Sequence, residues 1–260
     1  MELMPHGSHI VRRKLTAVKI KLDFGQFLIQ HLTMVKNDPA TDKGEQTRRH
    51  ILQCALELFR EKGFDATTMQ DVATRANVAK GATYYYFSSK EAIIQAYYEV
   101  VQAEQERICA EAFAGDRNLK ARLRVAMHSK FDLAKNDRKL LGVVFRYTGE
   151  PEHLLSCLGP GTAEIRERAT NVFRDTIAGE KLPKDLEILL PVALWALQMG
   201  LLVMFLYDNS NDQRRTRQLA DGALDLTLKL LALAKLPVLK PVRTKILALL
   251  RDAELLPSNG

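Results

Sequence analysis

The chain has 260 residues, 47% of them hydrophobic and 27% charged, which is ordinary for a globular protein of one or two domains with a real core. Its formal net charge of +7 is compatible with a polyanionic partner such as DNA but does not require one. The three distant cysteines and the scattered histidines exclude a disulfide framework and a metal-ligand spacing, so we expect a cytoplasmic protein without metal or cofactor.

Residues 1–44 differ in pattern from the rest of the chain. The segment VRRKLTAVKIKL is basic, and no long apolar stretch precedes a small-residue cleavage site, so the sequence predicts no signal peptide. We expect residues 1–44 to form a poorly ordered extension. Residues 1–33 are either additional to the native protein or a basic arm that touches DNA.

Helical periodicity begins at about Gln46 and continues to Gly63, where a helix stop is expected. A second helix begins after Thr68, because Thr68 and Asp71 match the capping-box pattern, and it should end near Asn77. The spacing predicts a third, very short helix over residues 80–86.

A long fourth helix follows the segment SSKE. Ser88 and Glu91 have the spacing of a second capping box, with Ser88 as the N-cap. Apolar residues then recur on one face of this helix, at Ile93, Ile94, Tyr97, Val100 and Val101.

The remainder is also helical in pattern, and few alternating segments suggest strands. Breaks are expected at 114–118, 135–139, 148–153, 158–161, 179–183 and 207–212. The sequence therefore predicts an all-α protein of some nine to eleven helices. The apolar run 191–207 is shorter than the roughly 20 residues of a membrane span and contains Gln198, so it favours a core or interface helix and no membrane partner.

Two short helices joined by a tight turn form the helix-turn-helix unit, whose second helix enters the major groove of DNA. The sequence TRRHILQCALELFREKGFDATTMQDVATRANVAKGATYYYFSSKEAII resembles the DNA-binding domain of the TetR/AcrR family over about residues 45–100. The matching positions are Ala55, Leu58, Phe59, Gly63, Phe64, Thr67, Thr68, Gly81, Tyr84, Phe87, Lys90 and Glu91.

The resemblance assigns roles around the four consecutive aromatic residues 84–87. It implies that Lys80, Gly81 and Ala82 face base edges and that Tyr84 and Tyr86 direct hydroxyls to phosphates. It also places Tyr85 at the groove edge, Phe87 in the core, Lys90 on a phosphate, and Thr68 and Gln70 on the opposite wall of the groove. The same division follows from the ~100° rotation between successive helix residues.

Two positions depart from the family pattern. Ala79 stands where a capping serine is common, and Thr83 stands where a larger aliphatic residue is usual. The Thr83 methyl group packs inward or the side chain rotates toward the groove, so Thr83 stays among the DNA-binding candidates. The tyrosines have a structural alternative as half-buried residues with bonded hydroxyls. Residues 46–99 hold seven basic and six acidic residues, so placement and dimerisation, more than bulk charge, must supply affinity.

The expected domains are 45–103 for DNA binding and 104–236 for ligand binding and dimerisation. Residues 237–260 should form a basic amphipathic helix, over about 242–255, and a tail. Pockets between helices are mostly apolar, and we expect a hydrophobic effector of moderate size. The lining candidates, each with plain core as its alternative, are Phe113, Met127, His128, Phe131, Phe145, Tyr147, Phe173, Trp195 and Met199, and Arg146 is a second polar anchor beside His128.

A two-fold operator requires a two-fold protein. The resemblance implies a four-helix dimer interface made by helices over about 191–207 and 213–235; the alternative is that both helices only complete the monomer core. The candidate interface stripe consists of Leu219, Ala223, Leu226, Leu230 and Leu233.

The expected function is that of a dimeric, sequence-specific transcriptional regulator, a repressor released from a palindromic double-stranded operator by a small hydrophobic ligand. The alternative is a DNA-bound adaptor whose second domain binds a protein and no small molecule. No nucleophile elbow, P-loop, G-x-G-x-x-G or H-E-x-x-H motif is present, so we do not expect an enzyme.

Overall fold

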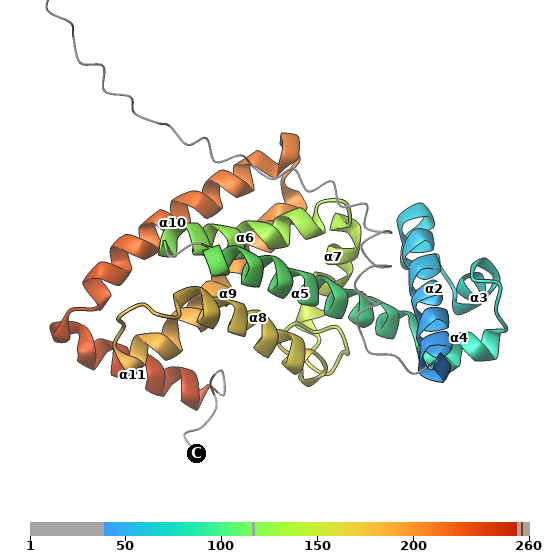
Figure 1. The fold of residues 1–260 in the computed structure, drawn as a ribbon, viewed down its shortest axis with the longest axis horizontal. Coiled ribbons are helices and arrows are strands. Elements are labelled where there is room, and N and C mark those ends of the chain that lie inside the picture. The colour runs from blue at the N-terminus through green and yellow to red at the C-terminus, as the bar shows by residue number, and fades with distance from the viewer. Residues whose placement is uncertain (1–38, 116–117, 254–255, 257–260) are drawn as a thin grey trace, which may run out of the picture.

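The computed structural model describes residues 39–115, 118–253 and 256, and this part of the chain consists of helices and their connections without a strand. Three helices form a compact head at one end of the molecule: α2 (Pro39–Lys62), α3 (Met69–Arg75) and α4 (Lys80–Tyr86). The long helix α5 (Lys90–Gly115) runs from this head into a larger helical body (Figure 1). The all-α prediction is confirmed.

The larger body contains six further α-helices. They are α6 (Leu119–Ala134), α7 (Arg138–Arg146), α8 (Ala163–Ile177), α9 (Lys184–Tyr207), α10 (Arg214–Ala234) and α11 (Lys240–Asp252). Short 3-10 turns precede or follow them at Tyr147–Gly149, Pro160–Thr162, Asn211–Gln213 and Pro237–Leu239. In Figure 1, α10 covers the side of the bundle opposite α8, and α11 lies at the end farthest from the head.

The first helix differs from its predicted bounds at one end only. It begins at Pro39, earlier than Gln46, so residues 39–44 belong to a helix, whereas we expected a poorly ordered extension. It ends at Lys62 because Gly63 adopts a φ of +91°, a conformation that L-residues with side chains rarely take. The predicted roles of residues 1–33 lie outside the described residues.

The capping predictions have different outcomes. Thr68 makes the expected capping box with Asp71, and α4 has the predicted bounds. Ser88 is not the cap of α5: the helix begins one residue later, and the Ser89 hydroxyl accepts the amide of Ala92 at 3.2 Å. The residue at the reciprocal position is then Ala92, which cannot complete a capping box, so Glu91 has no such role.

Three apolar clusters are present among the described residues, and α5 contributes to the two larger ones. The first includes Phe59, Phe87 and Ile94 of the head and its junction with α5, and it extends to Leu133, Leu140 and Val143 of α6 and α7. The second fills the larger body, where Phe131 and Phe205 stack with ring centroids 5.2 Å apart. Because α5 supplies buried residues to both clusters, it joins head and body as one continuous element.

The C-terminal helix α11 is held by a buried ion pair. Arg243 donates to the Asp185 carboxylate at 2.6 Å and to the carbonyls of Ala234 and Leu236, while Leu247 packs against α9. Arg243 lies in the predicted basic amphipathic helix but is only 6% exposed; the carboxylate and the two carbonyls supply the partners that allow its burial.

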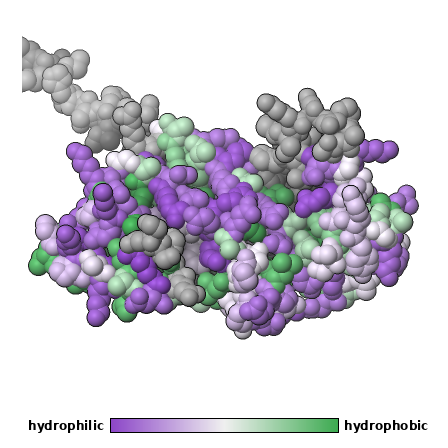
Figure 2. All heavy atoms as spheres, turned by 90° about the horizontal axis from the view of Figure 1, so that it is seen from below, coloured by the Kyte–Doolittle hydropathy of each residue, from purple (hydrophilic) through white to green (hydrophobic). Residues whose placement is uncertain are grey.

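Helix α9 is unusually apolar. Within the described residues it is the one helix long and apolar enough to cross a membrane, a test that core helices of globular proteins also meet. One face of α9 is buried in the second cluster, through Leu194, Leu201 and Phe205. The face of the molecule in Figure 2 is mostly hydrophilic, with small and separate hydrophobic areas.

The positive φ at Gly63 leads to a prediction. Gly63→Ala should lower the free energy of unfolding by about 1–2 kcal/mol, because the new Cβ meets no atom within 4 Å and only the backbone conformation is strained. Gly142→Ala, within α7 and equally free of contacts, is the control and should raise it by up to about 1 kcal/mol. Urea denaturation measures both; equal effects would contradict the backbone explanation.

Candidate nucleic-acid interface and ligand cavity

Helix α4 distributes its residues between solvent and core. Lys80 and Gly81 are exposed at its start, and Tyr84 and Tyr85 are 46% and 83% exposed. Tyr86 is half-buried against the first cluster, and Phe87 is buried below the Arg48 guanidinium at 5.0 Å. An exposed aromatic such as Tyr85 on a helix with a basic start is the kind of surface that contacts a sugar-phosphate backbone and base edges.

Thr83 does not lie on this exposed surface. Its side chain is 0% exposed, and its hydroxyl finds no partner among the described residues. The 100° rotation that exposes Tyr84 and Tyr85 turns Thr83 toward the core, where the methyl group substitutes for the aliphatic side chain usual at this position. Our inclusion of Thr83 among the DNA-contacting residues was therefore wrong.

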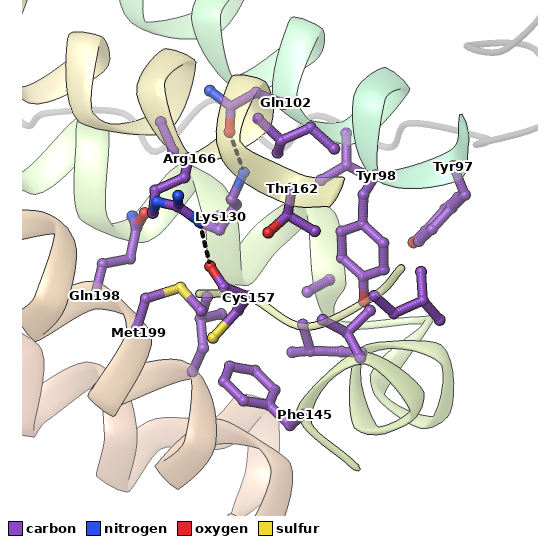
Figure 3. A pocket seen from close by; sticks show the side chains of 18 of the residues that line it. Tyr97, Tyr98, Gln102, Lys130, Phe145, Cys157, Thr162, Arg166, Gln198 and Met199 are labelled. Atoms are coloured by element: carbon purple, nitrogen blue, oxygen red, sulfur yellow. Dashed lines mark hydrogen bonds between the residues drawn. The ribbon is translucent and has the colours of Figure 1, made fainter. Parts of the chain in front are cut away.

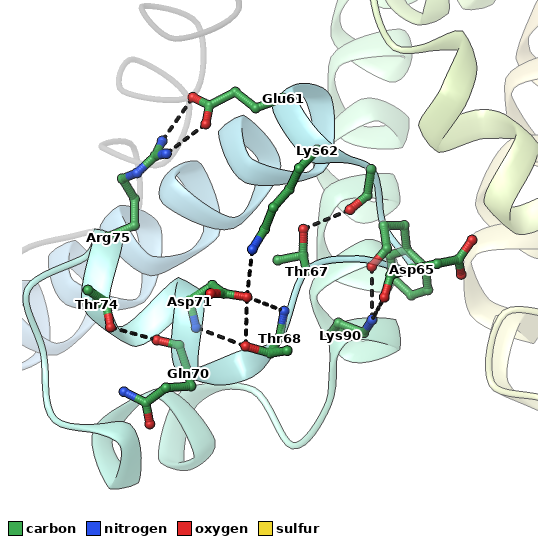
Figure 4. A network of polar contacts seen from close by, with 12 residues as sticks. Glu61, Lys62, Asp65, Thr67, Thr68, Gln70, Asp71, Thr74, Arg75 and Lys90 are labelled. Carbon is green, nitrogen blue, oxygen red and sulfur yellow. Dashed lines mark hydrogen bonds and ion pairs between the residues drawn. The ribbon is translucent and has the colours of Figure 1, made fainter.

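The start of α3 is fixed by a polar network (Figure 4). The Thr68 amide and hydroxyl both donate to Asp71 Oδ2 at 2.7 Å, and Lys62 Nζ lies 2.7 Å from the same oxygen. These contacts, with Lys62 the largest influence, hold the pKa of Asp71 well below its usual range. Thr68 is thus committed to the cap, while Gln70 remains exposed beside it.

Lys90 joins the start of α5 to the turn after α2. Its ammonium donates to the carbonyls of Phe64 at 2.8 Å and Asp65 at 3.4 Å, and it lies 4.6 Å from the centre of the Phe64 ring. In this structure Lys90 therefore stabilises the turn, and a phosphate contact by Lys90 stays a prediction.

Most basic side chains of the head already have acidic partners. Arg75 makes a two-pronged pair with Glu61, Lys62 pairs with Asp71, and Arg60 pairs with Asp137. Lys80 differs, since it is exposed and makes no ion pair or hydrogen bond with the described part of the chain. Lys80 is therefore the cation of α4 that is free to contact an external anion.

A partly open cavity of about 100 Å³ lies in the larger body (Figure 3). Helices α5 to α9 and the connection before α8 form its walls, through side chains that are mostly apolar. An engineered apolar cavity of about 150 Å³ binds benzene. The cavity thus accepts a small apolar group in this conformation, and a larger ligand requires the helices to separate.

Three of the nine lining candidates, Phe145, Trp195 and Met199, lie on the wall. The other six do not. Met127, Phe131 and Phe173 are buried within the second cluster, and Phe113 packs against that cluster. His128 bonds to Asp221 at 2.9 Å, and Tyr147 stacks on His153 at 3.6 Å.

Arg146, the second proposed anchor, pairs with Asp65 outside the cavity at 2.9 Å. Apolar periodicity could identify the inward faces of these helices but could not separate cavity wall from filled core, because both use the same residue types.

The sequence pattern did not identify the polar residues of the cavity wall. Gln198 was named only because it is polar within the apolar run 191–207. The others are Tyr98, Gln102, Lys130 and Arg166. A signal was present in the sequence. Lys130 lies between Met127 and Ala134 on the inward stripe of α6, where a solvated lysine is not expected.

Helices α9 and α10 present a second, exposed apolar surface. On α10, Leu219, Leu226, Leu230 and Leu233 are exposed and Ala223 is half-buried. The opposite stripe of the same helix is buried and consists of Thr216, Ala220, Leu224 and Leu231. The α9 face exposed to solvent contains no charge between Ile188 and Tyr207, and it includes Ala193, Ala196, Gly200 and Met204. We call these two exposed stripes the α9–α10 apolar face.

Comparison with known proteins identifies the family to which the head and the larger body belong. Residues 51–97 match the family of bacterial regulatory proteins named tetR, and residues 122–244 match the tetracyclin repressor-like C-terminal domain. The chain belongs to the TetR family. It is a DNA-binding transcriptional regulator of that family, and its relatives are regulators.

Among curated relatives of this TetR-family regulator, AcrR of Shigella flexneri is 26% identical over 152 residues, covering 55% of this chain and 70% of AcrR. Several other curated relatives are matched over half of their length or less. A TetR-family regulator from Syntrophomonas wolfei superposes with a TM-score of 0.56 at 17% identity, covering 70% of this chain and 94% of that one.

FadR of Thermus thermophilus, solved with lauroyl-CoA, gives a TM-score of 0.52 at 20% identity, with coverages of 71% and 93%. At these identities the structural likenesses establish the fold alone.

In this TetR-family chain, one buried carboxylate links the head to the cavity. Asp137, 3% exposed, lines the cavity at the start of α7. It accepts two hydrogen bonds from Arg60 of α2, at 2.6 and 2.8 Å, and one from the Tyr97 hydroxyl of α5 at 2.8 Å. Asp137, on the cavity wall, therefore bonds directly to α2 of the head.

The Arg60–Asp137 pair should contribute measurably to stability. Arg60→Met leaves the buried carboxylate without its cationic partner and should lower the free energy of unfolding by about 2–3 kcal/mol. Arg75→Met removes a pair of similar geometry on the surface, where water screens the charges, and should cost clearly less. Chemical denaturation compares the two variants, and equal losses would contradict the special role of Asp137.

Proposed function

We propose that this TetR-family regulator acts as a homodimeric repressor on a palindromic double-stranded operator and leaves it when a small, largely apolar ligand enters the cavity. The observation that carries the proposal is the direct link between the three-helix head, which exposes α4, and the cavity wall, through Arg60 of α2 and Asp137. The cavity also favours ligand control over the alternative adaptor, whose second domain would need no such space.

For DNA binding, the proposed base-reading residues are Lys80, Gly81 and Ala82 at the start of α4. Tyr84, Tyr85 and Tyr86 serve as backbone contacts, with Gln70, Thr68 and Lys90 at the edges of the groove. Support comes from the exposure of Lys80 and Tyr85 and from the start of α3, whose backbone is already fixed next to Gln70 before DNA binds. A rigid surface loses little entropy on binding.

For dimerisation, the proposed interface is the α9–α10 apolar face, with Leu219, Ala223, Leu226, Leu230 and Leu233 at its centre. Both helices already bury one stripe in the monomer core, so the outer stripes are not needed to complete that core. A large exposed apolar surface usually marks an interaction site. A two-fold pairing of this face gives the symmetry that a palindromic operator requires.

For ligand response, the proposed signal passes from the start of α7 to α2. A molecule larger than the present cavity displaces the wall that includes Asp137, which changes the position of Arg60 and hence of α2. Coupling of this kind typically amounts to ~1–3 kcal/mol between ligand and DNA. The Thermus thermophilus FadR structure was solved with lauroyl-CoA, which is a precedent for small-molecule binding within this fold.

We place this activity in the cytoplasm, where its DNA target lies, and assign the protein no enzymatic role. The described cysteines Cys54, Cys109 and Cys157 are free thiols, as suits a reducing compartment.

The reading helix can be tested by DNA selection. Purified protein should recover an inverted repeat from genomic fragments, and Lys80→Ala should weaken binding to that repeat by about tenfold or more. If Lys80 contacts a phosphate, its loss also lowers the slope of log affinity against log salt by about 1.

Lys181→Ala, an exposed lysine in the α8–α9 connection, is the control and should bind as the wild type does. Recovery of no repeat, with weak binding that salt abolishes, would contradict sequence-specific recognition.

The dimer interface can be tested with a charge. Leu226→Glu should raise the dimer dissociation constant by at least about a hundredfold, because a two-fold interface buries two unpaired carboxylates at roughly 3 kcal/mol or more. Leu158→Glu is the control, since both leucines are 56% exposed and Leu158 lies in a loop before α8. Sedimentation equilibrium measures both. A Leu226→Glu protein as dimeric as the wild type would contradict this interface.

A further inference from the structure

The cavity contains cationic side chains that no carboxylate of the chain neutralises. Lys130 Nζ donates to the amide oxygen of Gln102 at 2.8 Å, and the described part of the chain offers it no acidic group within 4 Å. Arg166 donates to the carbonyls of Cys157 and Gly159 at 3.0 and 3.2 Å and likewise has no acidic partner within the described ranges. Both side chains are half-buried, and withdrawing a cation from water without a counter-charge is costly.

The acidic groups near this cavity are already occupied. Asp137 receives Arg60 and Tyr97, as described above. Glu106 receives two hydrogen bonds from Arg168, at 2.9 and 2.8 Å, and only reaches Lys130 through the intervening Gln102 amide. Two wall cations, Lys130 and Arg166, are therefore left without a carboxylate partner within 4 Å in the described part of the chain.

The two cationic wall residues lie on the same side of the cavity, beside Gln198 and Met199 (Figure 3). Lys130, Arg166 and Gln198 lie on one side of the cavity in Figure 3, and Tyr97, Tyr98 and Phe145 lie on the others. The Tyr98 hydroxyl is buried and has no hydrogen-bond partner among the described residues. Apolar surface, a cationic end and one free hydroxyl together match a molecule with an apolar body and an acidic end.

We propose that the cavity binds a small organic acid, with its carboxylate on Lys130 and Arg166 and its apolar body against Phe145, Trp195 and Met199. This assignment rests on the proposed ligand response and adds the chemical class of the ligand. A charged hydrogen bond formed away from water gives the acid its advantage over a neutral molecule of equal shape.

Titration of Lys130 gives an independent signature. Burial lowers the pKa of Lys130 to about 8, while the neighbouring Glu106 raises it and Arg168 lowers it. Nearby Cys109 has its own pKa raised to about 11 by burial, so the thiol stays protonated at pH 9. A bound carboxylate favours the charged amine. At pH 9 the complex therefore takes up a proton that the free protein lacks, and affinity decreases as pH rises above about 8.

The test uses two pairs of probes with matched skeletons: octanoate with 1-octanol, and 3-phenylpropanoate with 3-phenylpropan-1-ol. Calorimetry on the full chain at pH 7 should give each acid an affinity about tenfold or more above its alcohol, the low end for a charged hydrogen bond. Lys130→Met should abolish that preference without lowering the melting temperature, since it removes a half-buried charge that has no acidic partner within 4 Å. Lys135→Met, at the exposed end of the same helix, should keep it.

Calorimetry at pH 9 in buffers of different ionisation enthalpy measures the number of protons taken up when the acid binds. We expect the wild type to take up a proton and Lys130→Met to take up none. Equal affinities for acid and alcohol, no binding of either acid, or a preference that survives Lys130→Met would each overturn the inference.

Binding of the same compounds to the protein on its operator separates this inference from the proposed function. If an alcohol enters the cavity and releases DNA while neither acid binds, the acid assignment fails and ligand-dependent release stands. If an acid binds through Lys130 and leaves DNA affinity unchanged, the acid site stands and ligand-dependent release fails.

Discussion

A buried carboxylate at the junction of two packed helical units sets the constraint on which the rest of the molecule depends. Asp137 needs the Arg60 guanidinium and the Tyr97 hydroxyl as donors, because an unpaired charge at this depth is too costly to retain. A displacement of α2 relative to α7 that breaks these bonds leaves the carboxylate without its partners, so intermediate positions are unfavourable. The head is therefore expected to occupy discrete positions, which is what a regulator with two functional states requires.

Local sequence signals predicted the head well and the body only in outline. The bounds of α4, the stop at Gly63 and the cap at Thr68 depend on residues a few positions apart, so their physical causes are visible in the chain itself. Ser88 and Ser89 both precede a helical pattern, and the choice of Ser89 depends on where the preceding turn brings the backbone. The cavity wall depends on contacts between five helices, and the spacing of apolar residues along one helix does not reveal such contacts.

The same limitation explains why polar residues were overlooked. The sequence pattern gives Lys130 no assigned role and places Arg243 on a basic amphipathic helix, yet Lys130 lines a cavity and Arg243 is buried against Asp185. Each has distant partners in the chain, Gln102 for Lys130 and Asp185 for Arg243, so the partner could not be assigned from spacing. A basic residue on the inward stripe of a helix deserves a search for such a partner before it is assigned to solvent.

The continuity of α5 has a consequence for engineering chimeras. No loop separates the head from the body along this helix, and its 26 residues supply apolar side chains to both clusters. A head cut out at the family boundary, residue 97, would keep only the start of α5 and would lose its packing against Val101, Leu133 and Leu140. Exchange of DNA specificity between relatives should therefore move the surface of α3 and α4 alone, grafted onto an intact α5, so that the recipient keeps its own Arg60 and Asp137.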